Sequence, residues 1–232
     1  AAVRNGAGLF DVSHMGVWDI KGRGAEAFLN AVTANDVEAL DVGRAHYSYL
    51  LGVDGIPVDD IFVYRLAQDH FMLVVNAAND DKDWAWVNGI LNADVMIDPQ
   101  NPGAAAPGRH DVALRNLRDP AVGQDMRVDL ALQGPRSRDV LLSLHASDQD
   151  RASIRGLPWA GIAHVTLNGY DVIVTRTGYT GERVAFELFI HPEQAPAFFR
   201  DLVEGGATPC GLAARDSTRT EAGLPLYGHE LA

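Results

Sequence analysis

Residues 9–21 alternate between apolar and polar side chains with the two-residue period of a β-strand. After the turn at 22–24, apolar side chains return at the three- and four-residue spacing of a helix, at Ala25, Phe28, Leu29 and Val32. Asn35 and Asp36 then interrupt this spacing. The pattern predicts a half-buried strand, a glycine turn and an amphipathic helix, in that order.

The same order of elements returns in the second half of the chain. Residues 128–132 alternate as a strand, Gly134-Pro135 forms a turn, and Val140, Leu141 and Leu144 have helical spacing. Three β-rich runs follow in each copy, at 47–51, 61–64 and 71–75 and at 162–167, 172–175 and 185–190. A helix closes each copy, at 82–91 and at 195–203. We therefore expect two pseudo-repeated β-α-β-β-β halves, at about 9–97 and 118–232.

The turns between the predicted strands indicate the fold class. Tight turns such as Asn168-Gly169 join consecutive strands directly and make them antiparallel. This favours an α+β fold with largely antiparallel sheets over a doubly wound α/β sheet. Between the copies, residues 98–108 contain three prolines and two glycines, which predicts an irregular surface loop. Residues 1–5 are typical of the end of a helix that Gly6 or Gly8 terminates.

Composition and charge narrow the class of protein. Hydrophobic residues make up 47% of the chain and charged residues 22%, as in folded soluble proteins. The formal net charge of −12 repels polyanions and argues against a nucleic-acid partner. Cys210 is the single cysteine, which excludes an intrachain disulfide and favours a reducing compartment. Because no apolar run approaches the ~20 residues of a membrane span, we expect a soluble, cytoplasmic protein with no membrane partner.

Several familiar catalytic motifs are missing from the sequence. It has no P-loop, no GxSxG elbow, and no HxxxH or HExxH among its eight histidines, so we expect no metal site. Ser13 and His14, near Asp11, do not predict a catalytic triad, because neighbours on a strand point to opposite faces. Cys210 is interpreted as a small apolar filler rather than a nucleophile.

The acidic pair Asp59-Asp60 lies between a turn and an apolar strand. Alternation places one carboxylate on the face of Ile61 and the other on the face of Phe62. A carboxylate against an apolar wall is desolvated and can act as a base or stabilise a developing cation. A capping or turn role explains the same pattern, and the sequence alone leaves both open.

Two further segments carry candidate binding residues. Glu187 lies within an apolar strand, with Phe186 and Leu188 on the opposite face, so it faces either solvent or a cavity in which it accepts two parallel N–H bonds. Arg215 and Asp216 open a predicted helix at 217–222. Arg215 can bind an anionic substrate or form a surface ion pair, and both interpretations stay open.

Seven segments taken in order resemble the folate-binding domain of the aminomethyltransferase family, whose type member is the T-protein of the glycine cleavage system. They are GLFDVSHMG at 8–16, VDD at 58–60 with VY at 63–64, VVNAAN at 74–79, LQGP at 132–135, RTGYTGE at 176–182, FEL at 186–188 and GLAARD at 211–216. The resemblance spans nearly the whole chain.

The resemblance implies a tetrahydrofolate-dependent one-carbon transfer. The aminomethyl group carried on the dihydrolipoyl arm of the lipoylated H-protein would pass to tetrahydrofolate with release of ammonia, in the cytoplasm or, in a eukaryote, the mitochondrial matrix. By position in the motifs, Asp60 would be the catalytic carboxylate and Glu187 would hold the pterin. The same motifs imply that Arg215 and Asn76 line the substrate channel and that Tyr47, Met15 and Tyr179 pack around the cofactor.

The chain departs from the family pattern at several places. Ile56-Pro57 follows Gly55 where a second glycine is usual, residues 183–185 are one residue longer than the common pattern, and 98–117 is expected to be an insertion. The amino-terminal segment and the carboxy-terminal barrel domain of the family are expected to be absent.

Two other functions stay open. One is another folate-dependent enzyme, such as a demethylase or the folate domain of a dimethylglycine or sarcosine dehydrogenase. The other is a non-catalytic folate-binding protein like those linked to iron–sulfur assembly. This second function is disfavoured because the segment Arg176-Thr177-Gly178-Tyr179 lacks the Lys-Gly-Cys-Tyr type of motif.

Overall fold

A computed structural model describes residues 1–231, and these residues form two compact units. Unit 1 comprises residues 1–14 and 123–226, and unit 2 comprises residues 15–122 with the described residues from 227 onward. Each unit has its own sheet and its own apolar core. Residues 9–14 therefore belong to unit 1, although the sequence placed them in the first half of the repeat.

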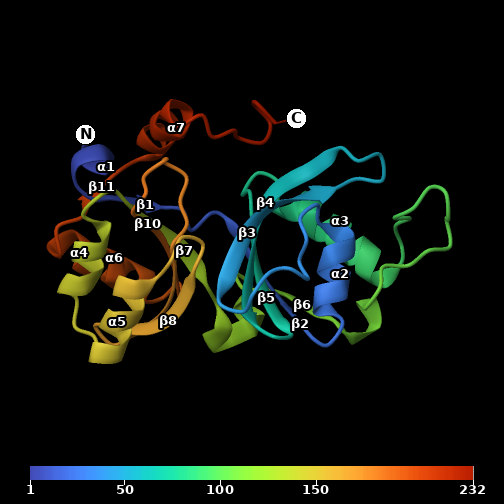
Figure 1. Cartoon of the computed structure of the whole chain (residues 1–232), viewed down its shortest axis with the longest axis horizontal. Coiled ribbons are helices and arrows are strands. Elements are labelled where there is room, and N and C mark those ends of the chain that lie inside the picture. Colours follow the sequence, from blue (N-terminus) through green and yellow to red (C-terminus); the bar gives the residue numbers. More distant parts are fainter. Residues whose placement is uncertain (232) are drawn as a thin grey trace. The chain divides into compact units, whose positions relative to one another are not determined.

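Unit 2 contains a five-stranded antiparallel sheet with the order β3-β4-β5-β2-β6. Its strands are β2 (Gly16–Lys21), β3 (Arg44–Leu51), β4 (Pro57–Ala67), β5 (His70–Val75) and β6 (Ala113–Asn116). The helices α2 (Ala25–Val32) and α3 (Asp80–Asn92) pack on one face and form a core with Trp18, Ile61 and Leu73 (Figure 1). A 3₁₀ turn, η1 (Arg109–Asp111), precedes β6, and η2 (Pro120–Asp125) leads out of the unit.

Unit 1 contains a six-stranded sheet with the order β11-β1-β7-β10-β9-β8. Its strands are β1 (Gly8–Asp11), β7 (Val128–Gln133), β8 (Ile162–Leu167), β9 (Tyr170–Thr175), β10 (Ala185–Ile190) and the short β11 (Thr208–Pro209), which is parallel to β1. The helices α4 (Ser137–Ser143), α5 (Asp148–Gly156) and α6 (Ala195–Glu204) cover the face of Leu132, Phe186 and Leu188 (Figure 1). The unit also contains α1 (Ala2–Asn5) and α7 (Leu212–Glu221).

The two units repeat one topology. In unit 2 the elements run β2-α2-β3-β4-β5-α3, and in unit 1 they run β7-α4, then α5, then β8-β9-β10-α6. The sheets have the matching orders β2-β5-β4-β3 and β7-β10-β9-β8, and these pairings are all antiparallel. The predicted α+β class with antiparallel sheets is confirmed. Each sheet also contains a strand that precedes the other repeat in the chain. The strand β1, which precedes β2, pairs with β7, and β6, which precedes β7, pairs with β2.

The single strand predicted at 9–21 is wrong. A turn separates β1 from β2, because the Asp11 side chain accepts the backbone N–H of Ser13 at 3.0 Å and closes an Asx-turn. Ser13 and His14 thus lie in a turn and not on a strand. The two strands are also mostly buried rather than half-buried, and each lies between two neighbouring strands of its sheet.

Other differences concern helix starts and short elements. The predicted helix at 217–222 begins at Leu212 instead, so Arg215 and Asp216 lie inside α7. The stretch 98–117, expected as an insertion, contains β6, which Arg115 anchors to Asp19 of β2 at 2.7 Å. The sequence also missed α5, although Ser147 caps it by accepting the backbone N–H of Asp150 at 3.0 Å, a capping pattern readable in sequence.

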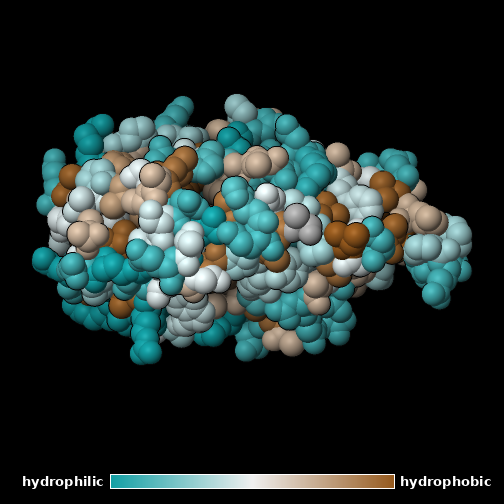
Figure 2. Space-filling view, turned by 90° about the horizontal axis from the view of Figure 1, so that it is seen from above, coloured by the Kyte–Doolittle hydropathy of each residue, from teal (hydrophilic) through white to brown (hydrophobic). Residues whose placement is uncertain are grey.

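The surface seen in Figure 2 is dominated by hydrophilic side chains, with apolar ones in small groups. The large apolar residues that are exposed come from separate segments: Val42, Tyr47, Val53, Ile56, Met96, Trp159 and Leu212. Within residues 1–231, no helix combines the length and the apolar character needed to cross a bilayer.

The start of α2 depends on a close backbone contact with the loop ahead of β6. A Cβ added at Gly24 would lie 1.9 Å from the carbonyl oxygen of Gly108, so Gly24→Ala forces the two backbones apart. We expect a loss of about 1–3 kcal/mol in the free energy of unfolding. Denaturant unfolding measures it, with Gly103→Ala as control because a Cβ there meets nothing within 4 Å. Equal stability of the two variants would contradict this contact.

Candidate functional site

Asp59 and Asp60 lie on opposite faces of β4, as the alternation predicted. Asp59 lies on the same face as Ile61, which belongs to the core under α2 and α3, and it is 0% exposed. Asp60 is half-buried and lies on the other face, with Phe62. On that face aromatic rings contact one another along the strands, with centroid distances of 5.2 Å for Tyr47–Tyr49 and 5.8 Å for Tyr47–Phe62.

Both carboxyl oxygens of Asp60 accept hydrogen bonds. The Tyr47 hydroxyl donates to Oδ2 at 3.0 Å, and the Asn76 side-chain amide donates to Oδ1 at 2.8 Å. Burial raises the pKa of Asp60 above its ordinary value, and the charge of Asp59 adds to the rise, whereas the bonds from Tyr47 and Asn76 oppose it. The result is a carboxylate fixed in orientation and partly removed from water.

Asp59 organises the segment between β5 and α3. It accepts the backbone N–H and the side-chain amide of Asn76, each at 3.0 Å, and the side-chain amide of Asn79 at 2.6 Å. The Asn76 amide thereby lies between the two carboxylates, one on each face of β4. The resemblance implies that Asn76 lines the substrate channel, and in the structure its amide also holds Asp60 in place.

In unit 1, Glu187 lies on β10 opposite Ala131 of β7 and Thr175 of β9. It is only 9% exposed, so the solvent-facing interpretation is wrong. Its side chain accepts a hydrogen bond from the Thr177 hydroxyl, which also contacts the Thr175 hydroxyl at 2.7 Å. Phe186 and Leu188 belong to the core on the other face, as expected.

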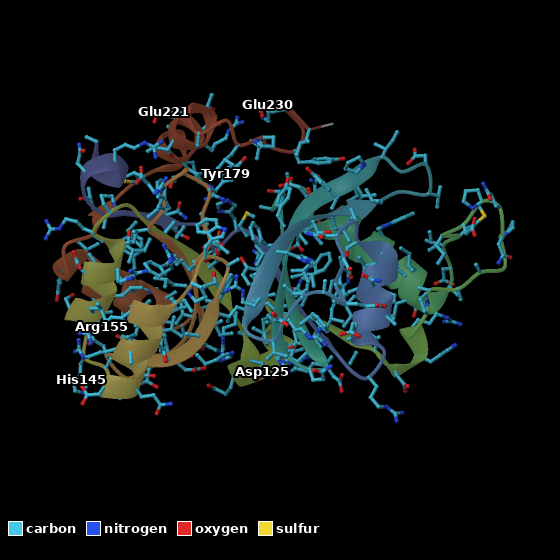
Figure 3. The ribbon with its side chains drawn as sticks, viewed as in Figure 1. Asp125, His145, Arg155, Tyr179, Glu221 and Glu230 are labelled. Atoms are coloured by element: carbon cyan, nitrogen blue, oxygen red, sulfur yellow. The ribbon has the colours of Figure 1, made fainter. Side chains whose placement is uncertain are left out.

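Tyr179 lies on the connection between β9 and β10 (Figure 3). Its hydroxyl donates to the carbonyl of Pro225 beyond α7, and its backbone N–H donates to Gln133 Oε1 at 3.1 Å. The Arg215 guanidinium lies 4.7 Å from the centroid of the Tyr179 ring, a cation–π arrangement. One nitrogen of that guanidinium, Nη1, is buried without a hydrogen-bond partner among the described residues.

Sequence reasoning missed Asp129, a second buried carboxyl on the same face of the sheet as Glu187. Asp129 is 1% exposed and lies on β7. Its pKa is raised well above the ordinary value by burial and then by the charge of Glu187, while Arg215 opposes the rise. The signal was present, because Asp129 interrupts an apolar strand as Glu187 does.

The predicted site residues fall into two groups. Unit 2 brings together Asp60, Tyr47 and Asn76, and Met15 lies half-buried in the turn ahead of β2. In unit 1, Arg215 contacts Tyr179, and both Arg215 and Glu187 influence the Asp129 carboxyl. Because Asp60 and Glu187 lie in different units, their convergence on one ligand stays a prediction.

No group of three or more His, Cys, Asp or Glu side chains within residues 1–231 is placed to hold a metal ion. Cys210 is half-buried, and burial raises the pKa of its thiol, which disfavours the thiolate.

Comparison with known proteins identifies the family. The profile described as GCVT N-terminal domain matches residues 1–232. An aminomethyltransferase from Anoxybacillus flavithermus is 43% identical over 236 residues, which cover 100% of this chain and 57% of the relative. The chain therefore belongs to the aminomethyltransferase family. It spans about half the length of the curated relatives it matches.

Solved structures agree with the family. Glycine cleavage system aminomethyltransferase T from Bartonella henselae matches with a TM-score of 0.78 and 33% identity, over 99% of this chain and 54% of that chain. Heterotetrameric sarcosine oxidase from Corynebacterium sp. U-96 matches with a TM-score of 0.52 and 17% identity, over 88% of this chain and 85% of that one. The second likeness shows a shared fold alone.

Replacing Tyr47 tests how Asp60 is held. Tyr47→Phe removes a hydrogen bond that favours the charged carboxylate, so we expect the pKa of Asp60 to rise further. In the folded variant Asp60 then keeps its proton to higher pH than it does in the unfolded chain. The free energy of unfolding of the variant therefore falls over a wider pH range, as pH rises, than that of the unaltered protein.

The carboxyl ¹³C shift of Asp60, followed through a pH titration, measures this change. Tyr170→Phe, whose ring packs on Phe198 in unit 1, serves as control. An unchanged or lower pKa of Asp60 in Tyr47→Phe would contradict the proposed hydrogen bond.

Proposed function

We propose that the protein transfers an aminomethyl-derived one-carbon unit to tetrahydrofolate and releases ammonia, as a glycine-cleavage aminomethyltransferase. The observation that carries the proposal is the half-buried Asp60 carboxylate, held by Tyr47 and Asn76 in a chain of this family. Relatives named aminomethyltransferase at about 40% identity support it. Neither the folate-dependent demethylase nor the non-catalytic folate-binding function gains support from those relatives.

Buried polar atoms in unit 1 fit a folate ring. Asp129 Oδ1, Gln133 Nε2 and Arg215 Nη1 are buried and have no hydrogen-bond partner among the described residues. Leaving such atoms unpaired costs free energy, which a ligand edge that carries N–H donors beside carbonyl acceptors would recover. The amino-pyrimidine edge of a pterin has this character. We propose that Glu187 accepts its adjacent N–H groups with two oxygens.

Tetrahydrofolate supplies the nucleophilic nitrogen that takes up the one-carbon unit. Asp60 stabilises the positive charge that develops during this transfer. Because Tyr47 and Asn76 already fix the carboxylate, it needs no reorganisation as the charge forms, and partial burial strengthens its field relative to water.

The remaining residues bind and position. Arg215 attracts anionic groups of the substrate, and Tyr47, Met15 and Tyr179 pack against the folate. Asn76 lines the channel and orients Asp60. We propose the lipoylated H-protein as the partner that delivers the aminomethyl group, and the cytoplasm, or the mitochondrial matrix of a eukaryote, as the location.

Neutralising Asp60 tests the catalytic assignment. Asp60→Asn keeps the size of the side chain but removes its charge, so turnover in the complete protein should fall by at least ~10²-fold. Ammonia release from aminomethylated H-protein in the presence of tetrahydrofolate measures it. The control is Asp69→Asn, an exposed acid in the turn after β4. Unchanged turnover would remove Asp60 from the mechanism.

Glu187→Gln tests the binding assignment separately. The amide presents one acceptor oxygen and one donor group where the carboxylate presents two acceptors, so folate binding should weaken by about tenfold or more. Equilibrium titration with tetrahydrofolate measures the Kd, and Glu193→Gln, exposed ahead of α6, is the control. An equal Kd in both variants would show that Glu187 does not contact the pterin.

A further inference from the structure

A second carboxyl group, which the proposed mechanism does not use, lies beneath the Asp60 site. Asp83, in the first turn of α3, is 0% exposed, as is Asp59 on β4. A chain of short contacts joins them. Asn79 donates its side-chain amide to Asp59 at 2.6 Å, and its carbonyl accepts the backbone N–H of Asp83 at 2.8 Å. After burial, the side chain that raises the pKa of the Asp83 carboxyl most is that of Asp59.

The groups around Asp83 do not neutralise it. Within residues 1–231, no N–H or O–H group of another residue donates to either of its carboxyl oxygens. On α3, the Lys82 ammonium donates to the carbonyl of Val58 at 2.6 Å and lies over the Tyr227 ring, so it is directed to other partners than Asp83. Asp80, also on α3, accepts a hydrogen bond from the Trp18 indole at 2.8 Å. From β4, the charged groups are Asp59 and, beyond it, Asp60.

Two fully buried carboxyl groups that influence each other this strongly cannot both be ionised without a large cost, so one of them holds a proton. Asp59 accepts three N–H bonds, from Asn76 twice and from Asn79, so its oxygens are already engaged as acceptors. Asp83 receives none of this kind, so a proton on its carboxyl would make its hydroxyl the donor toward Asp59. The proton therefore belongs to Asp83.

We propose that Asp59 and Asp83 share a single proton, and that this acid pair is a positioning unit which sets the orientation of Asp60 through the Asn76 amide. The positioning role rests on the proposed function. In this arrangement the Asp83 hydroxyl donates to Asp59. The side-chain amide of Asn76 donates both to Asp59 Oδ1 at 3.0 Å and to Asp60 Oδ1 at 2.8 Å. With its proton lost, Asp83 would repel Asp59 and disturb the group that holds Asn76.

The pair has a pH signature that needs no substrate. Burial raises the pKa of Asp83 to about 9, and the hydrogen bond with Asp59 and its charge add to the rise. The folded protein thus keeps a proton that the unfolded chain releases above its ordinary pKa of 3.8. The stability linked to this proton is complete below that value and is lost as pH rises toward about 9.

Asp83→Asn replaces the shared proton with a permanent N–H donor, so its melting temperature should fall less than that of the unaltered protein between about pH 5 and pH 9. Asp81→Asn, an exposed acid in the same turn of α3, should keep the slope of the unaltered protein. A slope in Asp83→Asn equal to that of the unaltered protein would overturn the shared proton.

A direct measurement covers the case in which the variant does not fold. In the unaltered protein at neutral pH, the carboxyl ¹³C shift of Asp83 should be that of a protonated acid, and that of Asp59 should be that of a carboxylate. Two ionised groups would overturn the proposal.

Turnover separates positioning from folding alone. Asp83→Leu keeps the bulk of the side chain but removes the donor, so its kcat should be at least about tenfold below that of Asp83→Asn, with the KM for tetrahydrofolate within about threefold. Equal kcat values would overturn the positioning role. If the unaltered protein transfers no aminomethyl group, the proposed function fails, and the pH slope and the ¹³C shifts still decide whether the pair shares a proton.

Discussion

A carboxyl group buried on a β-sheet must either accept hydrogen bonds from N–H or O–H groups or hold a proton. This constraint governs both candidate sites. On β4, Asp60 accepts hydrogen bonds from Tyr47 and Asn76, which oppose the rise in its pKa that burial causes. On the other face of the strand, Asp59 takes its donors from the segment that leads into α3. In unit 1, burial beside Glu187 instead favours the neutral form of Asp129. The partners of each carboxyl group thus decide how strongly burial disfavours its charged form.

The repeated framework does not carry a repeated site. Asp60 lies on β4, whose counterpart in unit 1 is β9, whereas Glu187 lies on β10, whose counterpart in unit 2 is β5. The two units therefore share one order of four strands, but the two acids assigned to the candidate site lie on strands that do not correspond. A duplicated fold supplies two scaffolds on which polar side chains have separate roles, and here we propose charge stabilisation for one and ligand binding for the other.

Much of this could be predicted from local pattern, because alternation fixes the face of each residue on a strand. It placed Asp59 and Asp60 on opposite faces, and it located β8 and β10 to the residue. It failed where one side chain changes the backbone, as Asp11 does by turning the chain at Ser13. Contacts between distant segments, such as Asn79 with Asp59 or Arg215 with Tyr179, have no local period and could not be predicted from spacing.

The exchange of β1 and β6 between the repeats has a consequence for synthesis on the ribosome. Gly8 in β1 pairs with Gln133 in β7, and all of residues 15–122 is translated between them. Residues 15–122 can thus fold while the growing polypeptide still lacks β7, so β1 stays unpaired until β7 is made. An unpaired edge is a template for wrong association. Its brevity, four residues from Gly8 to Asp11, limits that hazard during the delay.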